Sequence, residues 1–192
     1  ADIAANGGHL DTGIFGTQFF FEVLAENGLN ELAYEAMNRK TAPSYGYWIE
    51  KGSTTPWEGW ENPGSGNHPM FGGGIVWFYR KLAGVNADPD DAGYRHIIFR
   101  PQPAGDMTWC SYSNMTPYGE ISSSWKKEKG SFIMNITVPV GSTATIYVPS
   151  KGGQITENGK KIGKNSNVTF TGNENGYFVY TAGAGKYSFT AL

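Results

Sequence analysis

The fold of the second half of the chain is decided by the stretch Phe132-Ile133-Met134-Asn135-Ile136-Thr137-Val138. Its first, third, fifth and seventh residues are large and apolar, which is the period of a β-strand that buries one face. The alternation returns at residues 144–148, where alanine, isoleucine and valine occupy every second position. The pattern therefore predicts strands that pack one face against a core.

Further strands are expected on both sides of this stretch, because β-branched and aromatic residues recur there in short runs separated by turn residues. Asn158-Gly159 is a two-residue hairpin signal, and Gly183-Ala184-Gly185 turns the chain into its last strand. Short strands at this spacing predict an antiparallel β-sandwich. The expected strands are Tyr94–Arg100, Met107–Asn114, Gly119–Lys127, Phe132–Val138, Ala144–Val148, Tyr177–Thr181 and Lys186–Ala191.

The composition changes ahead of these strands, after Ala83-Gly84. The segment Asp88-Pro89-Asp90-Asp91-Ala92-Gly93 has the proline, glycine and aspartate content of a linker or domain border. A chain of 192 residues is long enough for two small units. We therefore expect one domain over residues 1–88 and a second domain, the β-sandwich, over residues 89–192.

The first half of the chain has helical periodicity instead. A first helix is expected from the capping residues Asp11-Thr12 to Asn27-Gly28. Its apolar residues cover most of the circumference, so we expect it to be buried on more than one side. A second helix, from Asn30 as N-cap to about Lys40, is apolar on one face only. Two such segments separated by a short break are typical of the paired helices of helical toroids.

A third helix is expected after residues 42–69, a long, aromatic-rich connection in which regular periodicity stops. We expect Asn67 to cap this helix and an apolar stripe between Phe71 and Leu82 to face the core. The three consecutive glycines at residues 72–74 weaken its first turns by about 1 kcal/mol each relative to alanine. Glycines at that cost predict that another backbone or a ligand comes very close to the helix.

The connection contains the strongest functional signal, Gly52-Ser53-Thr54-Thr55-Pro56-Trp57-Glu58-Gly59-Trp60. It places one carboxylate, Glu58, between the indoles of Trp57 and Trp60. Aromatic rings cover the apolar faces of sugars, while a carboxylate binds sugar hydroxyls or acts on water as a base. The alternative is a surface loop whose tryptophans pack on a core and whose glutamate is solvated.

Neighbouring residues extend this candidate site. Tyr45, Tyr47 and Trp48 continue the aromatic stripe, with the alternative that they form a small hydrophobic cluster under the loop. His68 is a candidate to bind a sugar hydroxyl or to orient Glu58, and the alternative is a plain residue at a helix N-terminus. Glycoside hydrolysis also needs a second carboxyl group as general acid. Asp11, Glu50 and Glu61 are the nearest loop carboxylates, and none is an obvious partner.

Composition limits the classes of partner. Basic and acidic residues nearly balance, 15 against 17, which argues against nucleic acid or an anionic membrane as the main partner. The longest apolar run, around Ile14–Leu24, is interrupted by polar residues, so we expect no membrane span. The single cysteine, Cys110, and the lack of metal-ligand spacing predict neither a disulfide nor a metal or other cofactor.

Aromatic residues make up 15% of the chain and glycines number 27, a composition that suits an extracytoplasmic carbohydrate-active protein. We therefore expect a periplasmic or extracellular location rather than a cytoplasmic one. The chain begins at Ala1 without an initiating methionine, which indicates a mature product or an excised piece.

A set of motifs resembles, in order and spacing over almost the whole chain, consecutive motifs of the bacterial α-L-rhamnosidases of glycoside hydrolase family 78. They are His9-Leu10-Asp11-Thr12-Gly13-Ile14-Phe15-Gly16-Thr17, Pro43-Ser44-Tyr45-Gly46-Tyr47, Thr54-Thr55-Pro56-Trp57-Glu58, Asn67-His68, Leu82-Ala83-Gly84-Val85 and Arg100-Pro101-Gln102-Pro103. The resemblance implies an α+β multidomain chain with the last helices of an (α/α)6 toroid followed by an antiparallel β-sandwich.

The resemblance also implies roles for individual residues. Glu58 corresponds to the general base that activates water in an inverting hydrolysis of terminal α-L-rhamnose, and His68 to a residue that contacts the sugar. With the aromatic candidates Trp57, Trp60, Tyr45 and Trp48, these residues form the expected site. The family's general acid lies in an upstream motif ending in Asp-Glu, which residues 1–192 do not contain. We therefore expect the N-terminal remainder of the enzyme as a partner, and an isolated chain that is inactive.

Two other classes of function compete with this interpretation. A carbohydrate-binding module would use exposed aromatic residues on the sandwich, for which Trp109, Tyr112, Tyr118 and Trp125 are candidates. A purely structural accessory domain would brace an enzyme without binding sugar.

Overall fold

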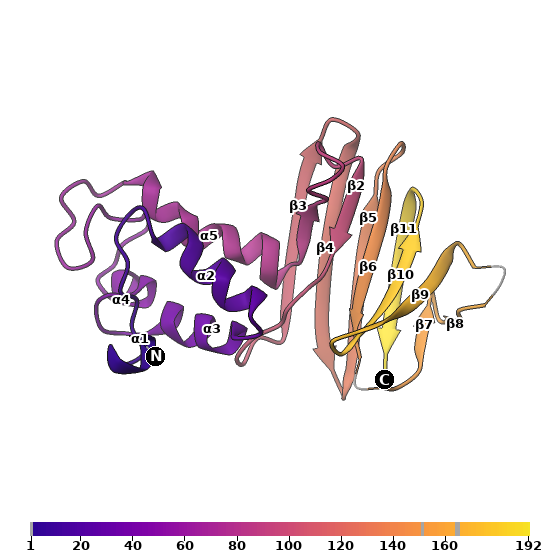
Figure 1. Cartoon of the computed structure of the whole chain (residues 1–192), viewed down its shortest axis with the longest axis horizontal. Helices are drawn as coiled ribbons and strands as arrows, with labels where there is room; N and C mark the ends of the chain where they lie inside the picture. Colours follow the sequence, from indigo (N-terminus) through magenta and orange to yellow (C-terminus); the bar gives the residue numbers. More distant parts are fainter. Residues whose placement is uncertain (1, 151, 164–165) are drawn as a thin grey trace. The chain divides into compact units, whose positions relative to one another are not determined.

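The computed structural model describes residues 2–150, 152–163 and 166–192, so the chain's first residue, Ala1, lies outside the described part. The chain divides into two compact units, a helical unit that ends at Phe78 and a second unit, Tyr79–Leu192, that is built of strands (Figure 1). The domain boundary that the sequence predicts after residue 88 stays a prediction.

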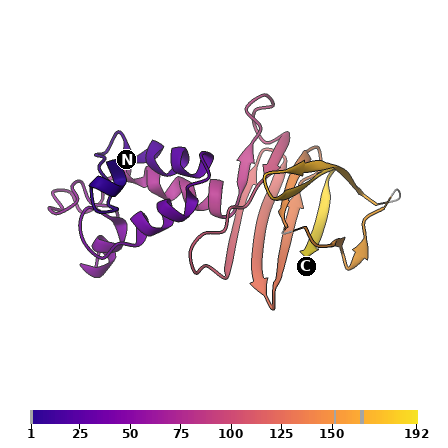
Figure 2. The ribbon, with the colours of Figure 1, turned by 60° about the horizontal axis from the view of Figure 1, so that its bottom comes forward.

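The helical unit consists of short helices. The helices α2 and α3 form a pair, and α2 also packs against α5, so that the three lie side by side in both views (Figures 1 and 2). A 3-10 turn, η1, leads into α5, and a π-helical turn, η2, continues from it into the second unit. The bounds are α1 (Asp2–Ala5), α2 (Thr17–Glu26), α3 (Asn30–Asn38), α4 (Tyr45–Glu50), η1 (Pro69–Gly72), α5 (Gly73–Trp77) and η2 (Phe78–Leu82).

Helix α2 ends where the sequence predicts but begins later. Its C-terminus is followed by Gly28 at φ +75°, and the N–H of Leu29 donates to the carbonyl of Leu24 over 2.8 Å. The predicted start at Asp11-Thr12 is wrong, because the first helical residue is Thr17. The Thr17 hydroxyl donates to the carbonyl of Gly13 over 2.7 Å and lies 3.0 Å from the hydroxyl of Thr12, so these groups close a turn ahead of the helix.

The predicted burial of α2 on more than one side is wrong for this structure. Phe21, Leu24 and Ala25 are buried, but Phe15, Phe19 and Val23 are 72%, 58% and 53% exposed. One side of the helix therefore packs on α3 and α5, and the other presents large apolar side chains to solvent.

Helix α3 has the predicted single buried face, which carries Ala33, Ala36 and Met37. Asn30 is not its N-cap, because Leu29 takes that position without a side-chain bond. Asn30 is instead a buried first residue whose amide oxygen accepts from the indole N–H of Trp77 over 2.7 Å. This bond ties α3 to α5.

Helix α4 lies in the connection for which no helix was predicted. Its N-cap is Ser44, whose hydroxyl oxygen accepts from the N–H of Tyr47 over 3.0 Å. The third helical segment begins at Pro69 after His68, so Asn67 is not its cap. The predicted approach of another backbone at the glycines is confirmed at Gly73, where a Cβ would lie 2.6 Å from the Cα of Gln18, whereas the group close to Gly74 is a side chain. A Cβ at Gly73 would lie 2.5 Å from the Cβ of Gln18, and a Cβ at Gly74 would overlap the ring of Tyr45.

The second unit is a β-sandwich of two sheets, as predicted. One sheet has the order β1-β2-β6-β10-β9 and the other β3-β4-β5-β11-β7-β8. One pair, β2 and β6, is parallel, so the first sheet is mixed rather than purely antiparallel. The strands are β1 (Val85–Ala87), β2 (His96–Phe99), β3 (Trp109–Thr116), β4 (Gly119–Glu128), β5 (Ser131–Val138), β6 (Thr143–Pro149), β7 (Ile155–Glu157), β8 (Lys160–Lys161), β9 (Val168–Glu174), β10 (Tyr177–Ala182) and β11 (Gly185–Ala191).

The core of the sandwich lies between the two sheets and contains the alternating residues of the predicted strands. Phe132, Met134, Ile136 and Val138 all belong to it. The predicted hairpin at Asn158-Gly159 joins β7 to β8, and both residues have positive φ, +50° and +73°. The alternation in β5 and β6 therefore predicted both the strands and their buried faces.

Candidate active site

The loop between α4 and η1 folds back on itself, so that the segment around Glu58 lies against the segment that leads to His68. The N–H of Glu58 points at the carbonyls of Pro63 and Ser65, each 3.1 Å away, and the N–H of His68 donates to the carbonyl of Pro56 over 2.8 Å. The hydroxyl of Thr55 donates to the carbonyl of Gly66. Two segments on either side of Gly59 are thereby held against each other, so residues ten positions apart share one region of the surface.

The Glu58 carboxylate is exposed to solvent yet fixed at one oxygen. Its Oε2 accepts from the main-chain N–H of Ser65 over 2.9 Å. Its Oε1 has no hydrogen-bond partner among the residues that the structure describes. One oxygen of this carboxylate is therefore held by the main chain, and the other is open to solvent.

Beneath the loop, an aromatic cluster of Tyr45, Trp48, Trp60 and Phe71 anchors it. The rings of Trp60 and Trp48 stack with centroids 4.6 Å apart, and the ring of Phe71 lies 4.5 Å from that of Trp60. The indole N–H of Trp48 donates to the carbonyl of Trp60 over 2.9 Å, and that of Trp60 donates to the carbonyl of Thr12 over 2.8 Å. The cluster therefore ties the loop both to α4 and to the segment ahead of α2.

Tyr45 and Trp48 are buried members of this cluster, 8% and 2% exposed. The Tyr45 hydroxyl donates to the carbonyl of Phe71, and desolvation by burial raises the pKa of Tyr45. Their placement matches the alternative of a hydrophobic cluster under the loop. Trp57 and Trp60 are half-buried and keep part of their surface accessible, and Trp57 lies 6.1 Å from Trp48 between ring centroids.

His68 is half-buried and immediately precedes η1, in an extended backbone conformation. Its Nδ1 atom is buried and has no hydrogen-bond partner among the described residues. The side chain does not cap the helical segment. The Nδ1 atom of His68 therefore remains available for a hydrogen bond that no described residue makes.

The three nearest loop carboxylates do not form a pair with Glu58. Glu50 makes an ion pair with Lys40 over 2.6 Å, and Asp11 and Glu61 are exposed. In the described part of the chain, none of the three shares a hydrogen bond or ion pair with Glu58. Among the described residues no group of histidine, cysteine or carboxylate side chains could hold a metal ion. No described helix is long and apolar enough to cross a membrane.

Two residues that contact Glu58, Gly64 and Ser65, were not predicted from the sequence. The available signal was the turn composition of Pro63-Gly64-Ser65-Gly66, which begins three residues after Trp60. That composition predicts a turn but does not say that the turn folds back onto the carboxylate.

The aromatic residues proposed for a sugar-binding face of the sandwich do not share one exposed surface. Trp109 is exposed, but Trp125 is buried, and its indole N–H donates to the carbonyl of Leu82 over 2.7 Å. Tyr112 is half-buried and stacks on Tyr79 with centroids 5.3 Å apart. Tyr118 is exposed like Trp109, so two of the four aromatic residues are accessible, and the four together do not form one exposed aromatic face.

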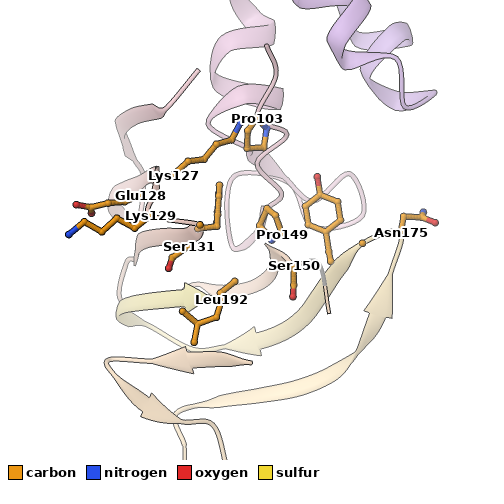
Figure 3. Close-up of a pocket in the computed structure, with 14 residues that line it drawn as sticks. Pro103, Lys127, Glu128, Lys129, Ser131, Pro149, Ser150, Asn175 and Leu192 are labelled. Carbon is orange, nitrogen blue, oxygen red and sulfur yellow. The ribbon is translucent and has the colours of Figure 1, made fainter. Parts of the chain in front are cut away.

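The sandwich has a cavity of about 660 Å³ at one end, lined by the β4–β5 and β9–β10 turns and by the ends of β6 and β11 (Figure 3). Lys127 extends toward Pro103, whereas Glu128 and Lys129 point away from the cavity (Figure 3). Glu128 makes an ion pair with Lys126 over 2.6 Å. None of the site residues expected from the sequence lies there.

The chain thus combines short paired helices, a loop carboxylate between two tryptophans and a following β-sandwich. Residues 1–82 match the bacterial α-L-rhamnosidase 6 hairpin glycosidase domain, and residues 84–163 match the bacterial α-L-rhamnosidase C-terminal domain. The chain therefore belongs to the bacterial α-L-rhamnosidase family.

Individual relatives agree with this assignment. An α-L-rhamnosidase of Streptomyces avermitilis is 33% identical over 98% of this chain, which covers 18% of that protein. The crystal structure of the Streptomyces avermitilis α-L-rhamnosidase complexed with L-rhamnose superposes with a TM-score of 0.89 at 32% identity, over 99% of this chain and 19% of that one. The α-L-rhamnosidase from Dictyoglumus thermophilum gives a TM-score of 0.86 at 38% identity, over 98% and 22%. This chain thus spans about a fifth of the length of these relatives.

Proposed function

We propose that the chain is part of an inverting glycoside hydrolase that releases terminal α-L-rhamnose, with Glu58 as its general base. The observation that carries the proposal is the Glu58 carboxylate, which is exposed, held at Oε2 and open at Oε1. The solved relative that superposes on 99% of this chain was crystallised with L-rhamnose, which supports the choice of sugar.

In the proposed reaction Glu58 removes a proton from a water molecule as that water attacks the anomeric carbon. Attack from the face opposite the leaving group inverts the configuration at that carbon. We assign the proton to Oε1, which is open to solvent, because the N–H of Ser65 already uses one of the acceptor sites of Oε2. We assign to His68 a hydrogen bond to a sugar hydroxyl, and to Trp57 and Trp60 contacts with the apolar face of the sugar. Tyr45 and Trp48 serve the site from below by fixing Trp60.

The general acid of this reaction has to protonate the leaving group, and we propose that it belongs to another part of a longer polypeptide. None of Asp11, Glu50 and Glu61 is paired with Glu58 in the described structure. An inverting enzyme nevertheless separates its two carboxyl groups by about 6.5–9.5 Å. The lack of a direct contact with Glu58 therefore does not by itself exclude these three residues as the general acid, and the experiment below tests whether this chain supplies the acid.

The exposed apolar side of the helical unit supports the same proposal. Phe15, Phe19 and Val23 of the α2 region are joined in the unit by the exposed side chains of Ile75 and Phe78. A groove of about 430 Å³ between α2 and the α5 region is lined by Ile14, Met70 and Val76 among others. Exposed apolar surface of this kind marks an interaction site. We propose that further helices of the hairpin domain cover it in the longer protein.

The experiment compares Glu58→Gln with Glu61→Gln in the longer polypeptide, with an aryl α-L-rhamnoside as substrate. Loss of the base lowers kcat by about 10²–10⁴-fold, the usual contribution of general acid–base catalysis. Glu61→Gln makes the same chemical change three residues away at an exposed side chain; it retains activity if the acid lies outside this chain, and a comparable loss of kcat would instead make Glu61 a candidate for the acid. The first product is the inverted β-anomer of rhamnose, detectable by NMR, and the isolated 192-residue chain has no turnover. If the isolated chain turns over substrate and Glu58→Gln abolishes that turnover, the proposal that the general acid lies outside this chain is wrong. If Glu58→Gln keeps full activity in the longer polypeptide, the proposal that Glu58 is the general base is wrong.

A further inference from the structure

We propose that Gly64 and Ser65 are positioning residues for the Glu58 carboxylate, an inference that rests on the proposed role of Glu58 as general base. Ser65 acts through its main-chain N–H, and Gly64 acts by having no side chain. Together they select one orientation for a carboxylate that the solvent would otherwise leave free to move.

Ser65 is paired with Glu58 in both directions. The N–H of Glu58 points at the carbonyl of Ser65 at 3.1 Å, and the N–H of Ser65 donates to Oε2 of Glu58 at 2.9 Å. A hydrogen bond to an ionised acceptor is stronger than one between neutral groups. An exposed glutamate without such a bond samples several rotamers, and ordering it during the reaction would add to the barrier. The pairing removes that motion before substrate arrives.

Gly64 leaves the space that the carboxylate occupies. A Cβ at this position would lie 2.8 Å from Oε2 and 3.4 Å from the Cδ of Glu58. The atoms that would be displaced are the far end of a flexible, exposed side chain, so a larger residue is accommodated by moving the carboxylate rather than by unfolding the loop. Substitution of Gly64 therefore tests the position of the base separately from the integrity of the fold.

The turn that carries these residues is itself supported. The N–H of Gly64 donates to the side-chain oxygen of Asn62 over 3.3 Å, and the hydroxyl of Thr55 holds the carbonyl of Gly66. The indole of Trp60 anchors the start of the turn in the aromatic cluster. A catalytic group is held most accurately when its partners lie on a supported segment of this kind.

The test compares two variants at Gly64 with a control at Gly66 in the longer polypeptide. Gly64 has φ +49°, so Gly64→Ala adds both backbone strain and a Cβ, whereas asparagine tolerates this conformation and Gly64→Asn adds mainly the Cβ. At Gly66 a Cβ would meet no atom within 4 Å and φ is not positive, so Gly66→Ala makes a matched change without touching Glu58.

Both Gly64 variants are expected to lower kcat by about 10- to 100-fold, the effect of misplacing a catalytic group by up to an ångström, with KM within about twofold of the parent. Gly66→Ala keeps the parent kcat, and all three variants keep the parent melting temperature within a few degrees, about the shift of 1 kcal/mol in a domain of this size. In a Glu58→Gln background, Gly64→Ala makes no further difference, because the group that it displaces is no longer a base.

The outcomes separate the two proposals. Parent kcat in Gly64→Ala and Gly64→Asn, together with an inactive Glu58→Gln, overturns the positioning role and leaves the general base intact. An equal loss from Gly64→Ala in the parent and in the Glu58→Gln background also overturns it, since that loss would come from the loop structure. Activity retained by Glu58→Gln overturns the proposed function and this inference with it.

Discussion

Replacing Trp48 by phenylalanine should loosen the candidate site without disturbing the sandwich. Trp48 is buried, its ring stacks on Trp60, and its indole N–H donates to the carbonyl of Trp60. Phenylalanine keeps an aromatic ring in the cluster but removes the donor and part of the ring. The perturbation therefore acts on two of the contacts that tie the loop to α4.

The magnitude follows from those two contacts. A carbonyl that loses its donor in a buried place costs about 1–3 kcal/mol, and the lower end applies here because Trp60 is only half-buried. The smaller ring leaves a cavity of about 40 Å³, which costs about 1 kcal/mol at about 24 cal/mol per Å³. We expect Trp48→Phe to lower the free energy of unfolding of the helical unit by about 2 kcal/mol.

Hydrogen exchange resolved by segment is the assay, because it reports the helical unit and the sandwich separately in one sample. Amides of α4 and of residues 58–65 should exchange faster in Trp48→Phe, with β4 and β5 unchanged. Trp109→Phe is the matched control, since Trp109 is 67% exposed and a surface change of this kind stays within about 0.5 kcal/mol. Equal protection in Trp48→Phe and Trp109→Phe would refute the conclusion that the aromatic cluster holds the loop.

Two further predictions concern the helical unit. Burial raises the pKa of Tyr45, so the folded state keeps a proton that the unfolded state releases, and the associated stability is present below about pH 10 and lost as the pH rises above it. The free energy of unfolding, measured with urea between about pH 9 and 11, should therefore decline less in Tyr45→Phe than in the parent. An equal decline in both proteins would contradict the assignment of this pH dependence to Tyr45. In the isolated chain, Phe19→Glu should reduce the binding of an apolar dye without loss of stability, because Phe19 is exposed there. In the longer polypeptide the same change should lower the melting temperature, while Val140→Glu, at an exposed position of the sandwich, alters neither measurement.

The sandwich could be predicted from the sequence because most of its strands have a local alternation of apolar and polar residues that indicates a β-strand. Residues 132–138 alternate in the chain and in the core, so local pattern and tertiary burial agree. β9 was missed because its third residue, Phe170, is exposed and the strand lies at the edge of its sheet. The parallel pairing of β2 with β6 joins residues more than 40 positions apart, and no local signal encodes it.

Some residues of the candidate site could be predicted from the sequence and others could not. Glu58 and His68 stood out by residue type and motif, and the structure brings their segments together through main-chain bonds. Gly64 and Ser65 did not stand out, because their contact with Glu58 depends on how the loop folds back, which residue types alone do not fix. The short helix α4 was hidden for a related reason. Its six residues are too few to show a helical period, although Ser44 is a suitable N-cap residue.

The error at α2 differs in kind from these omissions. Phe15, Phe19 and Val23 predicted a second buried side, and the structure exposes them. Fully burying a side chain such as phenylalanine or valine is worth about 1.5–3 kcal/mol, so the α2 region, which leaves three of them more than half exposed, forgoes several kcal/mol, a large part of the stability of a small domain. These side chains stabilise the protein only if another surface buries them. This chain spans about a fifth of the length of the relatives that it matches, so the remaining length is available to supply such a surface. The exposed apolar side of α2 supports the proposal that further helices of a longer polypeptide cover it, and the lack of a second carboxyl group paired with Glu58 among the described residues supports the proposal that the general acid lies there too.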